Sequence, residues 1–386
     1  MTLRSSQQTN QIIKDLHKKI VILTGPRQVG KTTLSKNLIS DYEYLNYDSH
    51  QDRTRIIKSE WNRNKELIVL DEVHKKKNWK SWIKGIYDTE KKPPYILVTG
   101  SAKLDIIKKM GDSLAGRFFQ HRLHPFDLKE LKGQYKSEDI FQRLLYLGGF
   151  PEPFISNSQD EASRWRKTHL DIILRQDLAD LESVRNIHGI ETLILLLRER
   201  VGSGISYSSL ARDLEVDPKT VKNWIRILEE LYIIFTITPY STKISRTLLK
   251  EPKIYFYDNG QVVGDEGAKF ENLVATALLK ELHLLEDLKG RTTGLHYLKT
   301  KEGKEVDFLI TIDRKPVLMI EAKWSDTHLS PHLFYFKDFF NQKKINPNIQ
   351  SIQLLAKEIE TKKNSSGIEM MSAIPWLENL SFHSLI

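Results

Sequence analysis

Cysteine is absent from the 386 residues of this chain. Without it the protein can form no disulfide framework, no thiolate metal site and no cysteine nucleophile. Apolar runs of membrane-spanning length are also missing, and the polar start MTLRSSQQTN lacks the apolar region of a secretory signal. We therefore expect a soluble cytoplasmic protein with no membrane partner. The length predicts two or three domains, each with its own core.

The chain also has fewer acidic than basic residues, and its formal net charge is +9 at pH 7. This balance favours a polyanionic partner and, taken alone, favours nucleic acid only slightly over other polyanions. Apolar strands alternate with helical stretches early in the chain, which predicts a parallel α/β domain. We expect four regions: an α/β domain at 1–130, a helical lid or linker at 131–185, a two-helix and β-rich unit at 186–257, and a second α/β domain at 258–386.

The segment GPRQVGKTT at Gly25–Thr33 fits the phosphate-binding loop pattern. Glycines at 25 and 30 let the backbone wrap a polyphosphate, and the following helix N-terminus faces the anion. Lys31 can reach the β- and γ-phosphates, and Thr32 can place its hydroxyl on Mg²⁺. The pattern predicts an ATP and Mg²⁺ site made by Gly25, Gly30, Lys31, Thr32 and Thr33.

Two further strands complete this predicted site. ELIVLDE at Glu66–Glu72 is an apolar strand that ends in two carboxylates. Asp71 can hold Mg²⁺, and Glu72 can polarise the attacking water. YILVTGSA ends in polar residues that could sense the γ-phosphate; we favour Ser101, with Thr99 as the alternative and simple turn chemistry as a third interpretation.

Arginines and tryptophans near these strands allow two interpretations each. Arg117 and Arg122 are candidates for an arginine finger, which often comes from a neighbouring subunit. We favour Arg117 and hence a homo-oligomer, although a structural arginine is an equal alternative for each.

The segment HKKKNWKSWIKG at His74–Gly85 could contact nucleic acid through lysines and stacked indoles. Its spacing favours an amphipathic helix with Trp79, Trp82 and Ile83 in the core.

The middle region resembles a winged helix-turn-helix. SYSSLARDLEV predicts a short helix, Asp217 and Pro218 form a turn, and KTVKNWIRILEEL predicts a second helix. The second helix has an apolar face and an opposite face that carries Lys219, Lys222, Asn223 and Arg226. In this motif that helix enters the DNA major groove, but winged helices also serve in protein packing.

A second candidate site lies in GKEVDFLITIDRKPVLMIEAKW, which predicts two strands joined by a turn. Asp307 and Glu321 could share a Mg²⁺ or Mn²⁺, and Lys323 could act on the attacking water. Glu271, near the start of an upstream helix, would complete the site through a metal-bound water. This order is that of the PD-(D/E)xK nucleases. The alternative is that Lys323 forms a structural salt bridge with Asp307 or Glu321.

The ordered motifs together resemble a known family over nearly the whole chain. They include GPRQVGKTTL, LIVLDE, VTGSA, LAGRF, LHPFDLKEL, LGGFPEP, YFYDNG, KFENLV, EVDF and IEAK. The chain resembles the prokaryotic AAA-type ATPases with a C-terminal region long labelled as of unknown function. That region joins a winged helix to a restriction-endonuclease-like α/β fold. The resemblance implies ATP and Mg²⁺ at Lys31 and Thr32, hydrolysis by Asp71 and Glu72, and a nuclease-like site at Glu271, Asp307, Glu321 and Lys323.

Two functions follow from these observations. The first is an ATP-hydrolysing, Mg²⁺-dependent DNA nuclease, with defence against foreign DNA or DNA repair as its setting. The second is a regulatory nucleotide switch whose nuclease-like domain only binds DNA or a protein partner. All four nuclease-type residues are present, which favours the first.

Overall fold

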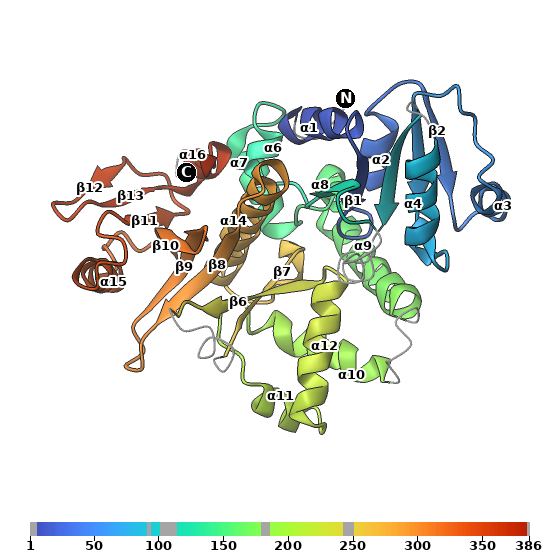
Figure 1. Ribbon diagram of the computed structural model, residues 1–386. Coiled ribbons are helices and arrows are strands. Elements are labelled where there is room, and N and C mark those ends of the chain that lie inside the picture. Colours follow the sequence, from blue (N-terminus) through green and yellow to red (C-terminus); the bar gives the residue numbers. More distant parts are fainter. Residues whose placement is uncertain (1–5, 91–93, 101–113, 179–185, 242–250, 384–386) are drawn as a thin grey trace. The chain divides into compact units, whose positions relative to one another are not determined.

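The computed structural model describes residues 6–90, 94–100, 114–178, 186–241 and 251–383. The chain forms two compact units, and Figure 1 labels helices and strands of both. The first comprises residues 1–125 with 230–232, and the second comprises residues 126–229 and 233–386. No helix among the described residues is both long enough and apolar enough to cross a bilayer.

The first unit contains a parallel five-stranded sheet in the order β2-β3-β4-β1-β5. Its strands are β1 (Ile20–Thr24), β2 (Tyr42–Asn46), β3 (Leu67–Asp71), β4 (Tyr95–Gly100) and β5 (Phe118–Arg122). The first four match the strands expected from apolar runs, so the predicted parallel α/β domain is confirmed. The strand β5 was not predicted, because FFQHR has neither a continuous apolar run nor a clear alternation.

Helices accompany this sheet at α1 (Ser6–Leu16), α2 (Lys31–Lys36), α3 (His50–Lys58) and α4 (Trp79–Thr89). Trp79 and Ile83 of α4 are buried in the core, and Trp82 packs against the same cluster. The indole N–H of Trp82 donates to Ser59 Oγ at 3.2 Å. The structure therefore confirms the core-packing interpretation of this segment over base stacking.

The second unit begins with helices, as expected for its first part. They are α6 (Leu128–Leu131), α7 (Ser137–Tyr146), α8 (Pro151–Ser156), α9 (Gln159–Ile172) with a π-helical turn at Ile173–Asp177, α10 (Ile187–Arg198), α11 (Tyr207–Asp213) and α12 (Pro218–Glu230). The Ser206 side chain caps α11, and the Asp217 carboxylate accepts from the Lys219 N–H at the start of α12. The apolar face of α12 is buried, whereas Lys219, Lys222 and Arg226 are exposed.

An eight-stranded mixed sheet forms the rest of this unit, in the order β12-β13-β11-β10-β9-β8-β6-β7. Its strands are β6 (Ile234–Pro239), β7 (Lys253–Phe256), β8 (Thr293–Lys299), β9 (Glu305–Ile312), β10 (Lys315–Lys323), β11 (Gln350–Leu355), β12 (Lys362–Lys363) and β13 (Ile368–Ser372). The long helix α14 (Glu266–Lys289) packs against β8 and β10 (Figure 1). Two further helices are α15 (Pro331–Gln342) and α16 (Ala373–Glu378).

This sheet runs across the boundary expected between residues 257 and 258. Strand β6 forms an antiparallel pair with β7 and a parallel pair with β8, where Thr238 lies opposite His296. The hairpin that follows α12 is thus part of the same sheet as the C-terminal strands. The arrangement matters for function because it brings β7 side chains next to residues of β9 and α14.

Candidate active sites

The phosphate loop of the first unit follows β1 and ends where α2 begins. Gly25 has a φ of 152°, and a Cβ at this position would lie 2.2 Å from the Leu123 carbonyl oxygen. Gly30 has a φ of 97° and precedes the first helical residue, Lys31. Both positions therefore require glycine, one for the close approach of a neighbouring backbone and one for its left-handed conformation. The loop has the local structure that the sequence pattern predicts.

Lys31 lies inside this loop. Its side chain is buried, and its Nζ donates to the carbonyl oxygens of Gly25 at 3.0 Å and Pro26 at 2.7 Å. These carbonyl contacts hold the ammonium within the turn of the loop. A bound polyphosphate would offer stronger, charged acceptors to the same ammonium.

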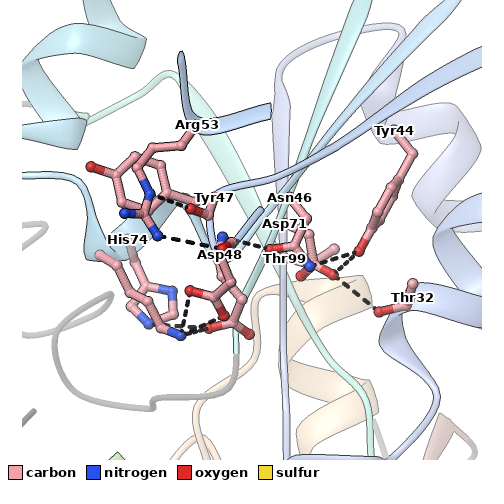
Figure 2. Close-up of polar contacts among 11 residues, drawn as sticks. Thr32, Tyr44, Asn46, Tyr47, Asp48, Arg53, Asp71, His74 and Thr99 are labelled. Atoms are coloured by element: carbon pink, nitrogen blue, oxygen red, sulfur yellow. Dashed lines mark hydrogen bonds and ion pairs between the residues drawn. The ribbon is translucent and has the colours of Figure 1, made fainter. Parts of the chain in front are cut away.

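Three hydroxyl groups converge on the carboxylate of Asp71, as Figure 2 shows. The Thr32 Oγ1 lies 3.1 Å from Asp71 Oδ2, and the Tyr44 hydroxyl donates to the same oxygen. The Thr99 hydroxyl donates to Asp71 Oδ1. Asp71 ends β3 and is only 5% exposed, and β4 supplies Thr99 directly opposite it. The predicted Mg²⁺ residues Thr32 and Asp71 are therefore within hydrogen-bond distance.

Tyr44 is a member of this cluster that sequence reasoning missed. Burial, followed by the hydrogen bond to Asp71, raises the pKa of its hydroxyl above the ordinary range. Its place follows from the register of the parallel strands β2 and β3, in which Asn46 lies opposite Asp71. A single tyrosine in a short strand carries no signal of that register, so only the structure reveals the contact.

Glu72, the predicted water-activating residue, follows Asp71 in a left-handed backbone conformation with a φ of 55°. Its carboxylate lies 3.5 Å from Lys75 Nζ and 3.7 Å from His74 Nε2. Lys75 in turn binds Asp48 at 2.7 Å. Such a conformation is uncommon for a residue with a side chain and is frequent at functional sites. Here it turns the chain sharply between the two acidic residues.

The γ-phosphate sensor expected at Ser101 lies outside the described residues. The alternative, Thr99, is fully buried, and its hydroxyl is engaged by Asp71. Thr99 therefore belongs to the Asp71 cluster. The assignment of Ser101 as the γ-phosphate sensor stays a prediction.

The two candidate arginine fingers lie at opposite ends of β5. Arg117 precedes the strand beside the start of β1, and its guanidinium binds Asp88 at 2.8 and 3.1 Å. Arg122 lies opposite Thr24, where β1 runs into the phosphate loop. The length of β1 therefore separates Arg117 from the loop by about 13 Å along the strand. A finger role for Arg117 requires a neighbouring subunit, whereas Arg122 lies at the correct edge of its own chain.

The second candidate site brings together the residues predicted from the C-terminal strands. The Ala322 N–H of β10 donates to Asp307 Oδ2 of β9 at 2.9 Å. The Lys323 Nζ lies 2.9 Å from Glu321 Oε1. Glu321 is 3% exposed, and its buried Oε2 has no hydrogen-bond partner among the residues that the structure describes. Lys323 therefore forms the salt bridge that was the structural alternative, while one carboxylate oxygen stays unsatisfied.

The three carboxylates of this site affect one another's protonation, because Lys253 contacts both Glu271 and Asp307, and Asp307 accepts from the residue after Glu321. Burial and then the charge of Asp307 raise the pKa of Glu321 to about 7. The same two causes raise the pKa of Glu271, on α14, to about 7. Although burial acts in the opposite direction, the ion pair with Glu321 raises the pKa of Lys323. All four residues expected from the PD-(D/E)xK order thus belong to one electrostatic cluster.

Lys253 of β7 is a fifth member of this cluster that sequence reasoning missed. Its Nζ lies 2.7 Å from Glu305, 3.3 Å from Glu271 and 3.5 Å from Asp307. Tyr255, on the same face of β7, donates to Glu271 Oε1 at 2.7 Å. The sequence does contain a sign of this contact: Lys253 begins the otherwise apolar and aromatic run KIYFY, and a lysine buried with such a strand needs an acidic partner.

The fit of a divalent cation rests on two carboxylates. Among the described ranges, no group of three or more histidine, aspartate or glutamate side chains is positioned to hold a metal ion. Asp307 and Glu321 supply hard oxygen ligands, and the unsatisfied Glu321 Oε2 is the observation that favours a cation there. Glu271, the expected ligand through water, instead accepts from Lys253 and Tyr255.

Family models match three consecutive parts of the chain. Residues 17–132 match a model described as AAA domain, which includes the phosphate loop and the Asp71 cluster. Two models, described as Domain of unknown function (DUF8612) and Domain of unknown function (DUF4143), match residues 138–263 and 266–376. The first unit is therefore an AAA-type ATPase domain. The resemblance noted from the sequence is confirmed for this domain and for the C-terminal domain of unknown function.

Relatives similar to most of the chain occur in bacteria and archaea. An uncharacterized protein of Mycobacterium tuberculosis is 26% identical over 77% of this chain and 68% of its own length. An uncharacterized protein of Methanocaldococcus jannaschii is 24% identical over 88% of this chain and 83% of its own. Among solved structures, a Walker-type ATPase of Pyrococcus abyssi is 15% identical, with a TM-score of 0.43 over 67% of this chain and 94% of that one.

Two substitutions separate ATP binding from hydrolysis. Lys31→Ala should weaken ATP binding roughly ten- to hundredfold, because a charged hydrogen-bond partner of the phosphates is lost. Glu72→Gln should leave binding nearly unchanged and lower turnover by roughly a hundredfold, because only the group expected to activate water changes. Nucleotide titration and phosphate release measure the two effects, with exposed Lys58→Ala as the control. Equal turnover in wild type and Glu72→Gln would remove Glu72 from this role.

Proposed function

We propose that this protein is an ATP-regulated, divalent-metal-dependent DNA nuclease. The ATPase part rests on the phosphate loop and the contact between Thr32 and Asp71. The nuclease part rests on one observation: Asp307 and Glu321 lie together beside Lys323, and a buried Glu321 oxygen is unsatisfied. A buried acceptor without a donor is costly, and a cation would satisfy it.

Each residue of the acidic site has a role in this proposal. Asp307 and Glu321 would hold Mg²⁺, or Mn²⁺ in its place, because both ions accept carboxylate oxygens. The bound ion would supply charge stabilisation at the scissile phosphate. Lys323, paired with Glu321, would orient the attacking water and assist its deprotonation. Glu271 would keep the cluster anionic without touching the ion, because its Oε1 accepts from Lys253 and Tyr255.

The positive face of α12 supports DNA as the substrate. Lys219, Lys222 and Arg226 are exposed on the side opposite the buried apolar face. Helix α11, the turn at Asp217 and helix α12 have the order of a helix-turn-helix, and the β6–β7 hairpin follows them. We propose that α12 contacts the phosphate backbone, as the second helix of that motif does.

A regulatory switch without cleavage is the second candidate function. Lys253 and Lys323 already neutralise carboxylates of the acidic site, and a group of three metal-ligating side chains is absent from the described part of the chain. These observations favour a domain that only binds DNA or a protein. Cleavage assays decide between the two candidates.

The nuclease proposal predicts that cleavage depends on Asp307 and Lys323 in different ways. Asp307→Asn should abolish cleavage and metal binding, because an anionic ligand is lost. Lys323→Ala should retain metal and DNA binding and slow cleavage by roughly 10²–10⁴-fold, the usual range for a lost acid–base group. Plasmid, single-stranded DNA and RNA are incubated with Mg²⁺ or Mn²⁺, with and without ATP.

The control for Lys323 is Lys315→Ala, an exposed lysine at the start of the same strand. It should cleave like wild type. Wild-type activity no higher than that of Asp307→Asn with every substrate and either ion would leave the switch as the supported function.

The DNA proposal predicts a salt-dependent contribution from α12. Replacing Lys219, Lys222 and Arg226 with glutamine should lower the slope of log affinity against log salt by up to about three, because each lost phosphate contact removes roughly one unit. The control neutralises three exposed lysines elsewhere in the unit, at 343, 344 and 357, so that net charge changes equally. Identical slopes in the two triple variants would assign α12 to protein packing.

The position of Arg117 leads to the proposal of a homo-oligomer in which each subunit supplies a finger to its neighbour. Arg117→Ala should lower turnover by roughly 10³-fold, the lower range for a lost finger. Mixing it with Lys31→Ala subunits should restore part of the activity, because some interfaces then combine an intact loop with an intact Arg117. Absence of complementation, together with a concentration-independent rate in wild type, would favour Arg122 acting within its own chain.

A further inference from the structure

Lys253 occupies the centre of the acidic site and is almost completely buried. Its side chain is 2% exposed, and three carboxylates surround the ammonium at 2.7 to 3.5 Å. A buried lysine needs anionic partners to keep its charge, and Glu305, Glu271 and Asp307 supply three of them within ion-pair distance. The ammonium group is therefore held among carboxylates, on a side chain that strand β7 carries.

Strand β7 also fixes the orientation of Glu271. The Oε1 of Glu271 accepts hydrogen bonds from both Lys253 and Tyr255, which lie two residues apart on one face. On another side, both carboxylate oxygens lie against Gly202, where an added Cβ would approach them to 2.8 Å. Glu271 is thus enclosed by β7 and the backbone near residue 202, so its oxygens are directed toward the internal cation.

Asp307 connects the internal cation to the open part of the site. Its Oδ1 lies 3.5 Å from Lys253 Nζ, and its Oδ2 accepts from the Ala322 N–H next to Glu321. This is the position of a bridging carboxylate in sites with two metal ions, where the ions lie about 3.5–4 Å apart. On the Oδ1 side of Asp307, the ammonium group of Lys253 lies where such a site would have one of its two metal ions.

The balance of charge agrees with one missing cation. Four carboxylates (Glu271, Glu305, Asp307 and Glu321) contact three lysines (Lys253, Lys299 and Lys323). One net negative charge remains when all are ionised, and the unsatisfied oxygen lies on Glu321, away from the Lys253 contacts. A single divalent cation beside Glu321 would satisfy this oxygen and change the net charge of the cluster from −1 to +1, whereas two such cations would raise it to +3.

We infer that Lys253 takes the place of a second metal ion and limits the acidic site to one divalent cation, held by Asp307 and Glu321. The inference rests on the metal-dependent function proposed above. Lys253 is a positioning residue, because it acts through Glu271, Glu305 and Asp307. The site would accordingly be specific for single-ion chemistry, with the fixed ammonium supplying the second positive charge.

The test counts Mn²⁺ ions bound to the full chain without nucleotide, by electron paramagnetic resonance of the free ion. Wild type should bind one more ion than Asp307→Asn. Lys253→Met, which keeps an unbranched side chain only one atom shorter and removes its charge, should bind a second ion or bind the first about tenfold more tightly, because a nearby positive charge is lost. A difference of two ions between wild type and Asp307→Asn would overturn the inference, as would equal counts in the two proteins.

A matched control separates position from net charge. Lys299→Met also removes one positive charge, but Lys299 is half-exposed and contacts only Glu305 in the cluster. It should bind one ion with an affinity close to that of wild type. Equal behaviour of Lys253→Met and Lys299→Met would overturn the inference, because net charge alone would then explain the effect.

A second variant keeps the test decisive if Lys253→Met does not fold, as judged by circular dichroism. Lys253→Met combined with Glu305→Gln removes the lysine together with its nearest carboxylate, while Glu271 and Asp307 remain. It should bind two ions, and one ion would contradict the inference. Failure of the nuclease proposal is distinguishable, because wild type would then bind one ion and cut no nucleic acid.

Discussion

A buried carboxylate needs hydrogen-bond donors or cations beside it, and this requirement shapes both candidate sites. In the ATPase unit, Asp71 accepts hydrogen bonds from the neutral hydroxyls of Thr32, Tyr44 and Thr99. In the second unit, the acidic residues form ion pairs with ammonium groups, of which that of Lys253 is deeply buried. Hydroxyls can share a carboxylate with an incoming Mg²⁺, whereas a fixed ammonium competes with it. The first arrangement therefore suits an exchangeable ion, and the second restricts where an ion can bind.

The sequence predicts those parts of the two candidate sites that a local pattern marks. The phosphate loop, Asp71 at a strand end, and the set Glu271, Asp307, Glu321 and Lys323 can all be found from residue type and spacing. Tyr44 and Lys253 cannot be placed in this way, because their contacts depend on which strands are neighbours and in what register. Lys253 still leaves a trace in the sequence, since a lysine in an apolar strand implies a buried partner.

Strand order also limits the arginines in a way that residue spacing cannot. Arg117 and Arg122 are only five residues apart in the chain. Because the extended strand β5 lies between them and runs parallel to β1, Arg117 lies near the start of β1 and Arg122 near its end. One end of these strands carries the phosphate loop and the other carries the Asp88 contact. The same short segment thus places Arg122 beside the phosphate loop of its own chain and Arg117 at the opposite end of the strands, where it pairs with Asp88.

The continuous sheet of the second unit gives the two proposed DNA contacts a common framework. Helix α12 leads directly into β6, and β6 pairs with both β7 and β8. Strand β7 carries Lys253 and Tyr255, which hold Glu271. A displacement of α12 would therefore act on β6 and β7, and through them on the carboxylates around Lys253. A helix that binds DNA at this position would be connected to the acidic site through hydrogen-bonded strands.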